Sequence, residues 1–464
     1  MNDKIYIFDF NKEWYLFNCI TYNFLRIPDD LTTSVIYYVR QNRIAPGDNI
    51  AIKNLIDFLR VNREFFNCKV DIHENSPKMP IFSFCPAHNC NFKCRYCFAK
   101  NEKVYSDTKI SQKMVDAVFD YMLSRFNQYN AFRLEFVSGG EPLLNFEAVK
   151  HACNLSHNLK KNGIEVNILL VTNASLLTDD ILEFFESNNV FLGISFDGTE
   201  KYQNSMRLIK NGDESYSIVA EKINRIKSSK KLVNTRNNLW IISVITSCCD
   251  SLVDIIKNLL CMGVKSAELR VARGNEEEGL FLNAQNIDHF IKIYDELCLY
   301  IIENIKKDIY DPLLLILNNY DTLGKLIKRL MCGNHVLYRC NAGVFKFAFT
   351  ATGDIYPCDS FVGLKEFKIG NIMDNERRDS AVREPVSARN QCDSCYFEYI
   401  CGGDCYYNSF VNNKDTKING TAYCLFMKEL CAMSIKILFV LKDNSKKYKE
   451  IKHHLMMRDY FNNY

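Results

Sequence analysis

The sequence predicts an α/β protein in which a partial (βα)6 TIM-like barrel follows a small α+β module and precedes a cysteine-rich domain. Strand-like and helix-like patterns alternate six times between residues 79 and 310. Residues 1–78 combine two strand-like segments with two helical patterns, and residues 336–443 hold most of the regularly spaced cysteines. A chain of 464 residues is long enough for two or three domains of this kind.

The first unit, residues 1–78, begins with the segments KIYIFDF and EWYLFNCI, whose aromatic and β-branched residues favour strands. A turn at Asn11-Lys12 separates them, and helical patterns follow at residues 32–41 and 49–62. Strands and helices in so short a stretch suit a winged-helix-like module. No motif in this unit carries chemistry by itself.

The second unit, residues 79–310, is expected to form a parallel sheet that curls toward a barrel, because its strands are apolar on both faces. The expected strands are residues 80–85, 133–137, 165–171, 190–195, 239–246 and 267–271. The expected helices are residues 112–126, 145–160, 178–187, 215–228, 252–262 and 287–305. Functional loops should lie at the carboxyl ends of these strands.

The remaining chain divides into a connector, a cysteine-rich domain and a tail. Residues 311–335 are expected to be a helical connector, and residues 336–443 carry the second cysteine array. Within that array, VFKFAFTATGDIYPC predicts a β-hairpin that turns at residues 352–354, and a helix is expected at residues 422–440. The tail, residues 444–464, is basic, and this pattern is more typical of a solvated helix face than of a binding arm.

Composition excludes several classes of partner. A formal net charge of +3 predicts neither a nucleic-acid nor a membrane partner. The first residues lack the basic and apolar regions of a signal peptide, and no apolar run is long enough to span a membrane. The expected location is therefore the cytoplasm, where clustered cysteines indicate metal sites before disulfides.

The first cysteine array is a C-x3-C-x2-C loop formed by Cys90, Cys94 and Cys97, directly after the first barrel strand. A cubane iron–sulfur cluster needs four ligands, so three thiolates leave one iron open. A structural zinc ion is the alternative, with His88 as its fourth ligand. The next strand ends in Ser138-Gly139-Gly140-Glu141-Pro142, whose glycines let the backbone approach a ligand closely.

The cysteine loop followed by this segment resembles the radical S-adenosylmethionine (SAM) enzymes. The resemblance implies that the three cysteines hold a [4Fe–4S] cluster and that the cofactor's methionyl group occupies the open iron. Reductive cleavage then gives a 5′-deoxyadenosyl radical that abstracts hydrogen from the substrate. The residues it implies at the cofactor are Gly139, Gly140, Glu141 and Pro142 for the methionyl amine, Arg207 for a carboxylate, and Thr172, Asn173, Ser195 and Tyr96.

Several of these residues have a simpler alternative. Asn173 and Ser195 could each cap a strand end, although their places at the ends of consecutive strands favour a site. Tyr96 could pack near the cluster and the adenine of SAM, or it could have a packing role only. Arg207 can offer a bidentate guanidinium, but related enzymes often carry His-Asp where this chain has Gln203-Asn204.

The second array resembles the SPASM domain, which binds two auxiliary [4Fe–4S] clusters, for three clusters in all. The resemblance implies one cluster held by the four-cysteine set of Cys392, Cys395, Cys401 and Cys424. It implies a second, nearer the active site, held by the three-cysteine set of Cys340, Cys358 and Cys405. Cys332 or a substrate thiolate could complete the second cluster.

Asp359 follows Cys358 directly, and the resemblance to sulfatase maturases implies that it is a general base. A carboxylate beside a cluster could accept a proton as an electron leaves the substrate. The alternative is that Asp359 only accepts backbone hydrogen bonds at the end of the hairpin.

Together these resemblances predict a radical SAM maturase that forms thioether crosslinks in a cysteine-rich, ribosomally made precursor peptide. Residues 1–78 weakly resemble the module that binds a precursor's leader as an added strand; a purely structural extension is the alternative. An electron donor such as flavodoxin or ferredoxin is expected. The alternatives are a sulfatase-type maturase that makes formylglycine and a non-enzymatic iron–sulfur protein for electron transfer or sensing.

Overall fold

A nine-stranded sheet forms the centre of the computed structural model, which describes residues 4–47, 49–67, 72, 79–99, 108–137, 139–374 and 382–462. Its strand order is β12-β11-β10-β4-β5-β6-β7-β8-β9. Strands β4 to β9 are parallel to their neighbours, which confirms the predicted parallel α/β arrangement. These strands are β4 (Ile81–Phe84), β5 (Ala131–Phe136), β6 (Glu165–Thr172), β7 (Phe191–Ser195), β8 (Leu239–Ile245) and β9 (Ala267–Val271).

In the described part of the chain, eight helices lie between or directly after these strands, and all except the two shortest begin and end close to the predicted residues. They are α4 (Gln112–Arg125), α5 (Phe146–Lys161), α6 (Asp179–Asn188), α7 (Glu200–Met206), α8 (Ser215–Ser228), α9 (Val233–Asn237), α10 (Leu252–Cys261) and α11 (Ile287–Ile305). Side-chain caps fix three of the starts: Ser111, Thr178 and Ser251 each accept a backbone N–H three residues on. The short helices α7 and α9 were not predicted.

The predicted hairpin is present and extends the barrel sheet beyond β4. Strands β10 (Lys346–Phe349) and β11 (Asp354–Tyr356) are antiparallel, and β12 (Gly370–Asn371) pairs with β11. The turn contains Gly353 at φ 85°, a left-handed conformation that favours glycine. Strand β10 also pairs in parallel with β4, a contact that the sequence did not predict.

The N-terminal module, defined here as residues 4–67, consists of β1 (Ile5–Phe10), β2 (Glu13–Asn18), β3 (Phe24–Arg26), α1 (Thr32–Gln41), α2 (Asn49–Val61) and α3 (Arg63–Asn67). A two-residue turn joins β1 to β2 as predicted, with Asn11 at φ 51° and Lys12 at φ 69°. The module has a small core of its own, which includes Leu16 and Val35. Strand β3 and helix α3 were missed, and the winged-helix-like assignment stays a prediction.

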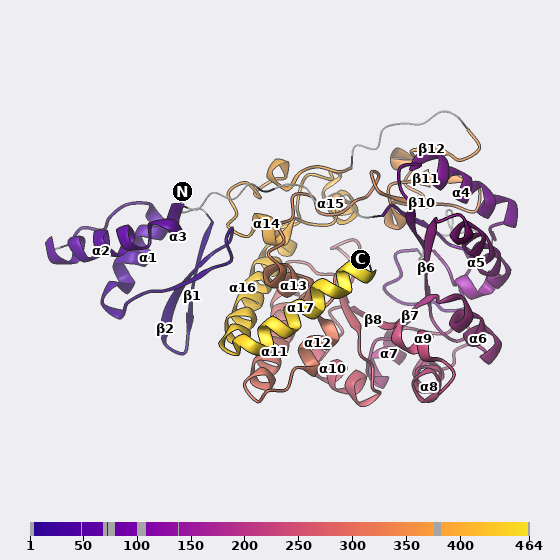
Figure 1. Ribbon diagram of the computed structural model, residues 1–464, viewed down its shortest axis with the longest axis horizontal. Helices are drawn as coiled ribbons and strands as arrows, with labels where there is room; N and C mark the ends of the chain where they lie inside the picture. The colour runs from indigo at the N-terminus through magenta and orange to yellow at the C-terminus, as the bar shows by residue number, and fades with distance from the viewer. Residues whose placement is uncertain are drawn as a thin grey trace.

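The sheet of the N-terminal module packs against the C-terminal half of α16 (Thr421–Asp443), with its helices outermost (Figure 1). The ring of Phe439 lies 5.8 Å from Phe8, 5.5 Å from Phe10, 4.6 Å from Tyr15 and 5.2 Å from Phe24, between centroids. One aromatic side chain of α16 therefore anchors all three strands of the module.

The C-terminal region is helical around its cysteine-bearing loops, with α12 (Asp311–Ile316), α13 (Gly324–Cys332), α14 (Glu398–Cys401), α15 (Tyr406–Asn413), α16 and α17 (Ser445–Asn462). The connector is helical, as predicted. The tail forms α17, whose Ile451 and Leu455 are buried, so it is not a wholly solvated face. Within the described part of the chain, no helix is long and apolar enough to cross a membrane.

Replacing Phe439 by alanine should loosen the N-terminal module from α16, because four aromatic contacts are lost at one position. Truncating a half-buried aromatic side chain should cost about 2 kcal/mol. Hydrogen exchange of residues 5–26 should accelerate while that of the barrel strands stays unchanged. Leu425→Ala is the matched control, because Leu425 lies on the same helix but is 51% exposed; equal exchange in both variants would contradict this anchor.

Candidate active site

The cysteine loop, residues 90–97, follows β4 and is held by backbone hydrogen bonds to the segment after α7. Lys93 N–H donates to Leu208 O at 2.7 Å, and Arg95 N–H donates to Met206 O at 2.9 Å. Lys210 N–H donates back to Asn91 O at 3.0 Å. The loop therefore has a fixed course at the carboxyl end of the sheet, where it was expected.

The two glycines after β5 allow the backbone to lie against the start of this loop. A Cβ on Gly140 would stand 1.9 Å from Ala87 O and 2.7 Å from Asn89 O, closer than any side chain permits. Gly139 has φ 86°, and Glu141 N–H donates to Asn89 O at 2.8 Å. The structure thus gives Gly140 a close approach to protein backbone, and the predicted approach of these glycines to a ligand stays a prediction.

Glu141 is buried and ties this segment to the end of β6. Its carboxylate accepts hydrogen bonds from Thr172 Oγ1 at 2.6 Å, Asn173 N–H at 2.9 Å and Leu143 N–H at 3.1 Å. Burial raises the pKa of Glu141, and these hydrogen bonds act in the opposite direction. Pro142 starts the 3-10 helix η2 (Pro142–Asn145). Four predicted site residues, Glu141, Pro142, Thr172 and Asn173, are thus brought together.

Asn173 also reaches the cysteine loop. Its Nδ2 donates to Asn91 Oδ1 at 2.9 Å and lies 3.8 Å from Cys90 Sγ. Sulfur that accepts N–H groups is stabilised as thiolate, the form that binds iron. Asn173 thus contacts the cysteine loop as well as the end of β6, and its cofactor role stays a prediction.

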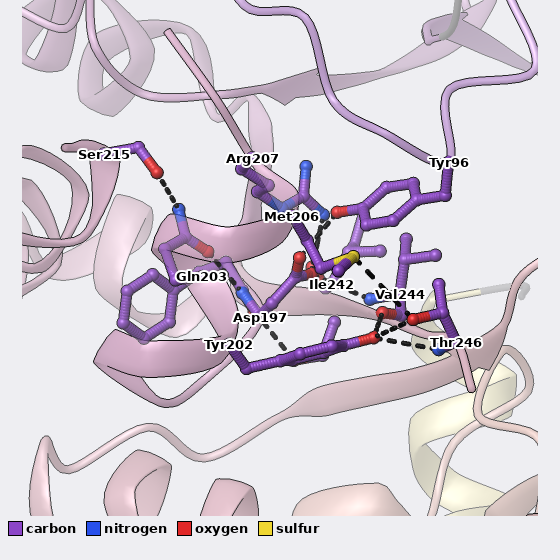
Figure 2. A network of polar contacts seen from close by, with 12 residues as sticks. Tyr96, Asp197, Tyr202, Gln203, Met206, Arg207, Ser215, Ile242, Val244 and Thr246 are labelled. Atoms are coloured by element: carbon purple, nitrogen blue, oxygen red, sulfur yellow. Dashed lines mark hydrogen bonds and ion pairs between the residues drawn. The ribbon is translucent and has the colours of Figure 1, made fainter. Parts of the chain in front are cut away.

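Asp197, two residues after β7, is the centre of a buried network that joins Tyr96 to Arg207 (Figure 2). Tyr96 Oη donates to Asp197 Oδ2 at 2.6 Å, and Arg207 Nη2 lies 3.0 Å from Asp197 Oδ1. The guanidinium carbon lies 5.3 Å from the centroid of the Tyr96 ring, and Val244 N–H also donates to Asp197. Asp197 was not singled out from sequence, although an acidic residue directly after a buried strand is a usable signal.

Arg207 remains capable of binding an anion despite this ion pair. Its Nε is buried and has no hydrogen-bond partner among the described residues. Burial lowers the pKa of Arg207, but Asp197, Tyr96 and Cys94 together outweigh this effect and raise it. An orphaned donor beside the cysteine loop fits the predicted carboxylate of the methionyl group. Ser195, at the end of β7, is half-buried nearby, and its cofactor role stays a prediction.

Within the second cysteine array, thiols of the same predicted set act on each other's pKa, while the ligand roles of the two sets stay predictions. Burial, together with neighbouring thiols of the four-cysteine set, raises the pKa of Cys424 to about 12 and that of Cys392 to about 11. Asn419 Nδ2 donates to Cys392 Sγ at 3.2 Å. In the three-cysteine set, burial raises the pKa of Cys358 to about 12, with Cys405 and Cys340 among the charges that add to it.

Cys332 lies at the end of α13, where its thiol perturbs the pKa of Tyr448 on α17. The charges that act most strongly on Cys340 include Cys405, Arg339 and Lys346, but not Cys332. The structure thus gives Cys332 a neighbour on another helix, and the fourth ligand of the three-cysteine set stays a prediction.

The predicted donor sets consist of cysteine thiols, the ligands that iron–sulfur clusters use. Among the residues that the structure describes, no group of three or more His, Cys, Asp or Glu side chains is close enough to hold one metal ion. His88, the alternative zinc ligand, accepts Ala351 N–H at Nε2 over 3.2 Å, and burial lowers its pKa.

Asp359 is held inside the sheet by side chains of two strands. Ser83 Oγ donates to Asp359 Oδ1, and Lys346 Nζ lies 3.2 Å from Oδ2. Lys346 also lies 3.0 Å from Glu135, which pairs with Arg133 at 2.8 Å. Burial lowers the pKa of Lys346, but Asp359 and Glu135 together raise it. Asp359 is therefore part of a charge network, and its role as a base stays a prediction.

Residues 84–246 match the family model of the radical SAM superfamily. The chain is 25% identical over 361 residues to a serine-type anaerobic sulfatase-maturating enzyme of Bacteroides thetaiotaomicron, covering 70% of this chain and 82% of that protein. It is 24% identical over 382 residues to a cysteine-type enzyme of Clostridium novyi, covering 76% and 95%.

Two groups of solved structures share the fold. Native anSMEcpe with bound AdoMet and the Kp18Cys peptide has a TM-score of 0.65 at 20% identity, covering 79% of this chain and 100% of that one. Streptococcus suis SuiB bound to its precursor peptide SuiA has a TM-score of 0.50 at 14% identity, covering 90% and 98%.

Gly140→Ala should disable the site, because the added methyl group overlaps the backbone that leads into the cysteine loop. A displacement of about 1 Å costs on the order of 100-fold in rate, so 5′-deoxyadenosine formation from SAM under reduction should fall at least that far. Gly279→Ala is the matched control, since a Cβ there meets nothing within 4 Å. Wild-type deoxyadenosine formation by Gly140→Ala would refute the packing argument.

Proposed function

Since residues 84–246 form a radical SAM domain, the chain is a radical SAM enzyme, and we propose that it is a maturase that oxidises a cysteine or serine of a peptide or protein to formylglycine. The observation that carries this proposal is the joint presence of the cysteine loop and two further cysteine sets in a chain similar to sulfatase maturases over most of their length. Formylglycine formation is better supported by these relatives than the thioether crosslink that the sequence led us to expect.

Cys90, Cys94 and Cys97 would hold a [4Fe–4S] cluster, with SAM at its open iron. When bound, this pair supplies a radical that removes a hydrogen atom from the substrate, and the auxiliary clusters accept the electron released afterwards. The chain itself orients these groups: Glu141 fixes the end of β6 through Thr172 and Asn173 N–H. Arg207 Nε is available for the methionyl carboxylate, while Asp197 holds the guanidinium in place.

Asp359 is the proposed acceptor of the proton that the substrate loses. Its carboxylate lies directly after Cys358, next to Ser83 and Lys346. Lys346 Nζ, 3.2 Å from Oδ2, gives this carboxylate a cationic neighbour, and a carboxylate can serve as a general base.

A thioether-forming maturase of leader-bearing peptides is the second candidate, and the N-terminal module favours it. The fold shared with SuiB extends over 90% of this chain, against 79% for the sulfatase-maturase structure. The module's sheet has β1 and β3 as its edges. An open edge is where an extended peptide can add as a further strand.

The hydrogen-bond pattern of β3 indicates which backbone groups would receive that peptide. Asn23 O and Ile27 N–H bond to β2. Because an antiparallel strand alternates between inward and outward groups, the peptide groups of Phe24 and Arg26 face away from β2. We propose that a leader strand pairs with these outward groups.

The two functions predict different products. With the Kp18Cys peptide as substrate, formylglycine formation removes two hydrogens, exchanges sulfur for oxygen and creates an aldehyde that reacts with a hydrazide probe. A thioether crosslink removes two hydrogens and one alkylatable thiol, and it creates no aldehyde. Mass spectrometry after hydrazide and iodoacetamide labelling separates the two. An unchanged Kp18Cys peptide, together with a crosslinked cysteine-rich precursor encoded beside this chain, would reject formylglycine formation in favour of the second candidate.

Arg26→Pro tests leader binding at β3, because proline removes the outward N–H and leaves the bonds to β2 intact. Loss of this hydrogen bond and the added ring should weaken precursor binding about tenfold. Arg26→Ala is the matched control, since it removes the same side chain and keeps the N–H. Both variants should cleave SAM normally. Equal precursor affinity in the two variants, measured by fluorescence anisotropy, would rule out strand addition at β3.

A further inference from the structure

Lys4, the residue before β1, connects the N-terminal module to the loop of the four-cysteine set. Its Nζ donates to Asp393 O at 3.0 Å, to Cys395 O at 2.7 Å and to Glu398 Oε2 at 2.7 Å. An ammonium group has three N–H donors. Every donor of Lys4 is therefore used on one short segment of the cysteine-rich region.

That segment carries three of the four predicted ligands. Asp393 and Cys395 lie in the turn closed by the Cys395 N–H to Cys392 O bond, at 3.0 Å. Glu398 is the first residue of α14, which ends at Cys401. Lys4 thus fixes the turn between the first two cysteines and the start of the helix that positions the third.

The charge of Lys4 is also needed here. Glu398 is 3% exposed, and a buried carboxylate without a cation is costly. Lys4 itself is only 22% exposed, so solvent screens this pair weakly. The ion pair therefore stabilises the segment as well as orienting it.

Aromatic side chains of β1 cover the same segment. The ring of Tyr6 lies 5.7 Å from Tyr396 and 5.0 Å from Phe397, between centroids. Figure 1 shows the module's sheet beside α16 and near α14. A second lysine bond crosses this interface elsewhere: Lys442 Nζ of α16 donates to Tyr22 O at 3.2 Å, away from the cysteine segment.

We propose that Lys4 is a positioning residue of the four-cysteine site, through which the N-terminal module holds residues 392–401 in the geometry that binds a cluster. The proposal rests on the proposed function, since it takes these cysteines as ligands of an auxiliary cluster. The positive charge of Lys4 also favours the reduced, more negative state of that cluster. The module is thereby part of the iron–sulfur site as well as a place for a peptide to bind.

Lys4→Met tests this assignment in the full-length, anaerobically reconstituted protein, with Lys442→Met as the matched control. Three cubanes correspond to about 12 irons per chain, so loss of one leaves about 8. Lys4→Met should lose iron toward that value, and any cluster retained should have a more negative midpoint potential in an EPR-monitored redox titration. In metal-free protein, hydrogen exchange of residues 392–401 should accelerate. Lys4→Arg, which keeps the charge and the donors, should restore iron content and potential.

The possible outcomes test the role of Lys4 and the auxiliary-cluster assignment separately. If Lys4→Met keeps the iron content, the potentials and the exchange rates of Lys442→Met, Lys4 is not a positioning residue. If wild-type protein itself holds only about 4 irons, the auxiliary-cluster assignment fails, and the role of Lys4 fails with it. Product formation from the Kp18Cys peptide is measured separately and judges the formylglycine proposal by itself.

Discussion

The parallel pairing of β10 with β4 is the interaction on which the arrangement of the cysteine loop and the three-cysteine set depends. Strand β4 leads into the cysteine loop, and β10 leads through its hairpin to Cys358. The register joins Lys346 to Ile81 and Phe349 to Phe84, so two segments far apart in sequence lie side by side within the sheet. Phe82 packs against Phe347 and Phe349 behind this pairing and holds the register.

This register also explains the charges inside the sheet. Ile81 stands opposite both Lys346 and Arg133, so these two side chains belong to the same row across three strands. Two residues on, Ser83 stands opposite Glu135. Buried charges persist when they are paired, and the chain from Arg133 through Glu135 and Lys346 to Asp359 meets that condition. A slip by one residue would turn Lys346 to the other face and leave Glu135 and Asp359 without their lysine.

Much of the barrel was predictable because its signals are local. Helices α8 and α11 and strand β9 match their predicted bounds, since apolar periodicity marks both ends of each element. The β10–β4 pairing could not be predicted, because strand propensity identifies a strand and not its partner. Strand β3, with three residues, is too short for any periodicity to mark it.

The same holds for the site: residues marked by a local sequence pattern were predicted, and residues that matter through distant contacts were not. The glycines, Thr172, Asn173 and Arg207 lie at strand ends or next to recognisable motifs, where sequence spacing has meaning. Asp197 was overlooked because its importance comes from Tyr96 and Arg207, which reach it from different loops. Lys4 gives no sequence signal at all, since a lone lysine before a strand is ordinarily a solvated charge.

The choice between the two candidate functions depends on parts of the chain outside the barrel. Both reactions begin with hydrogen abstraction and both need an acceptor for an electron, so the cysteine loop and the network around Asp197 serve either one. What differs is how the substrate is held, and here the N-terminal module is the distinguishing part. Its sheet contacts the four-cysteine segment through Lys4 on the β1 side and presents the outward groups of β3 on the other. A peptide bound at β3 would therefore be attached to the same three-stranded unit that supports the cysteine segment, whichever bond the enzyme finally makes.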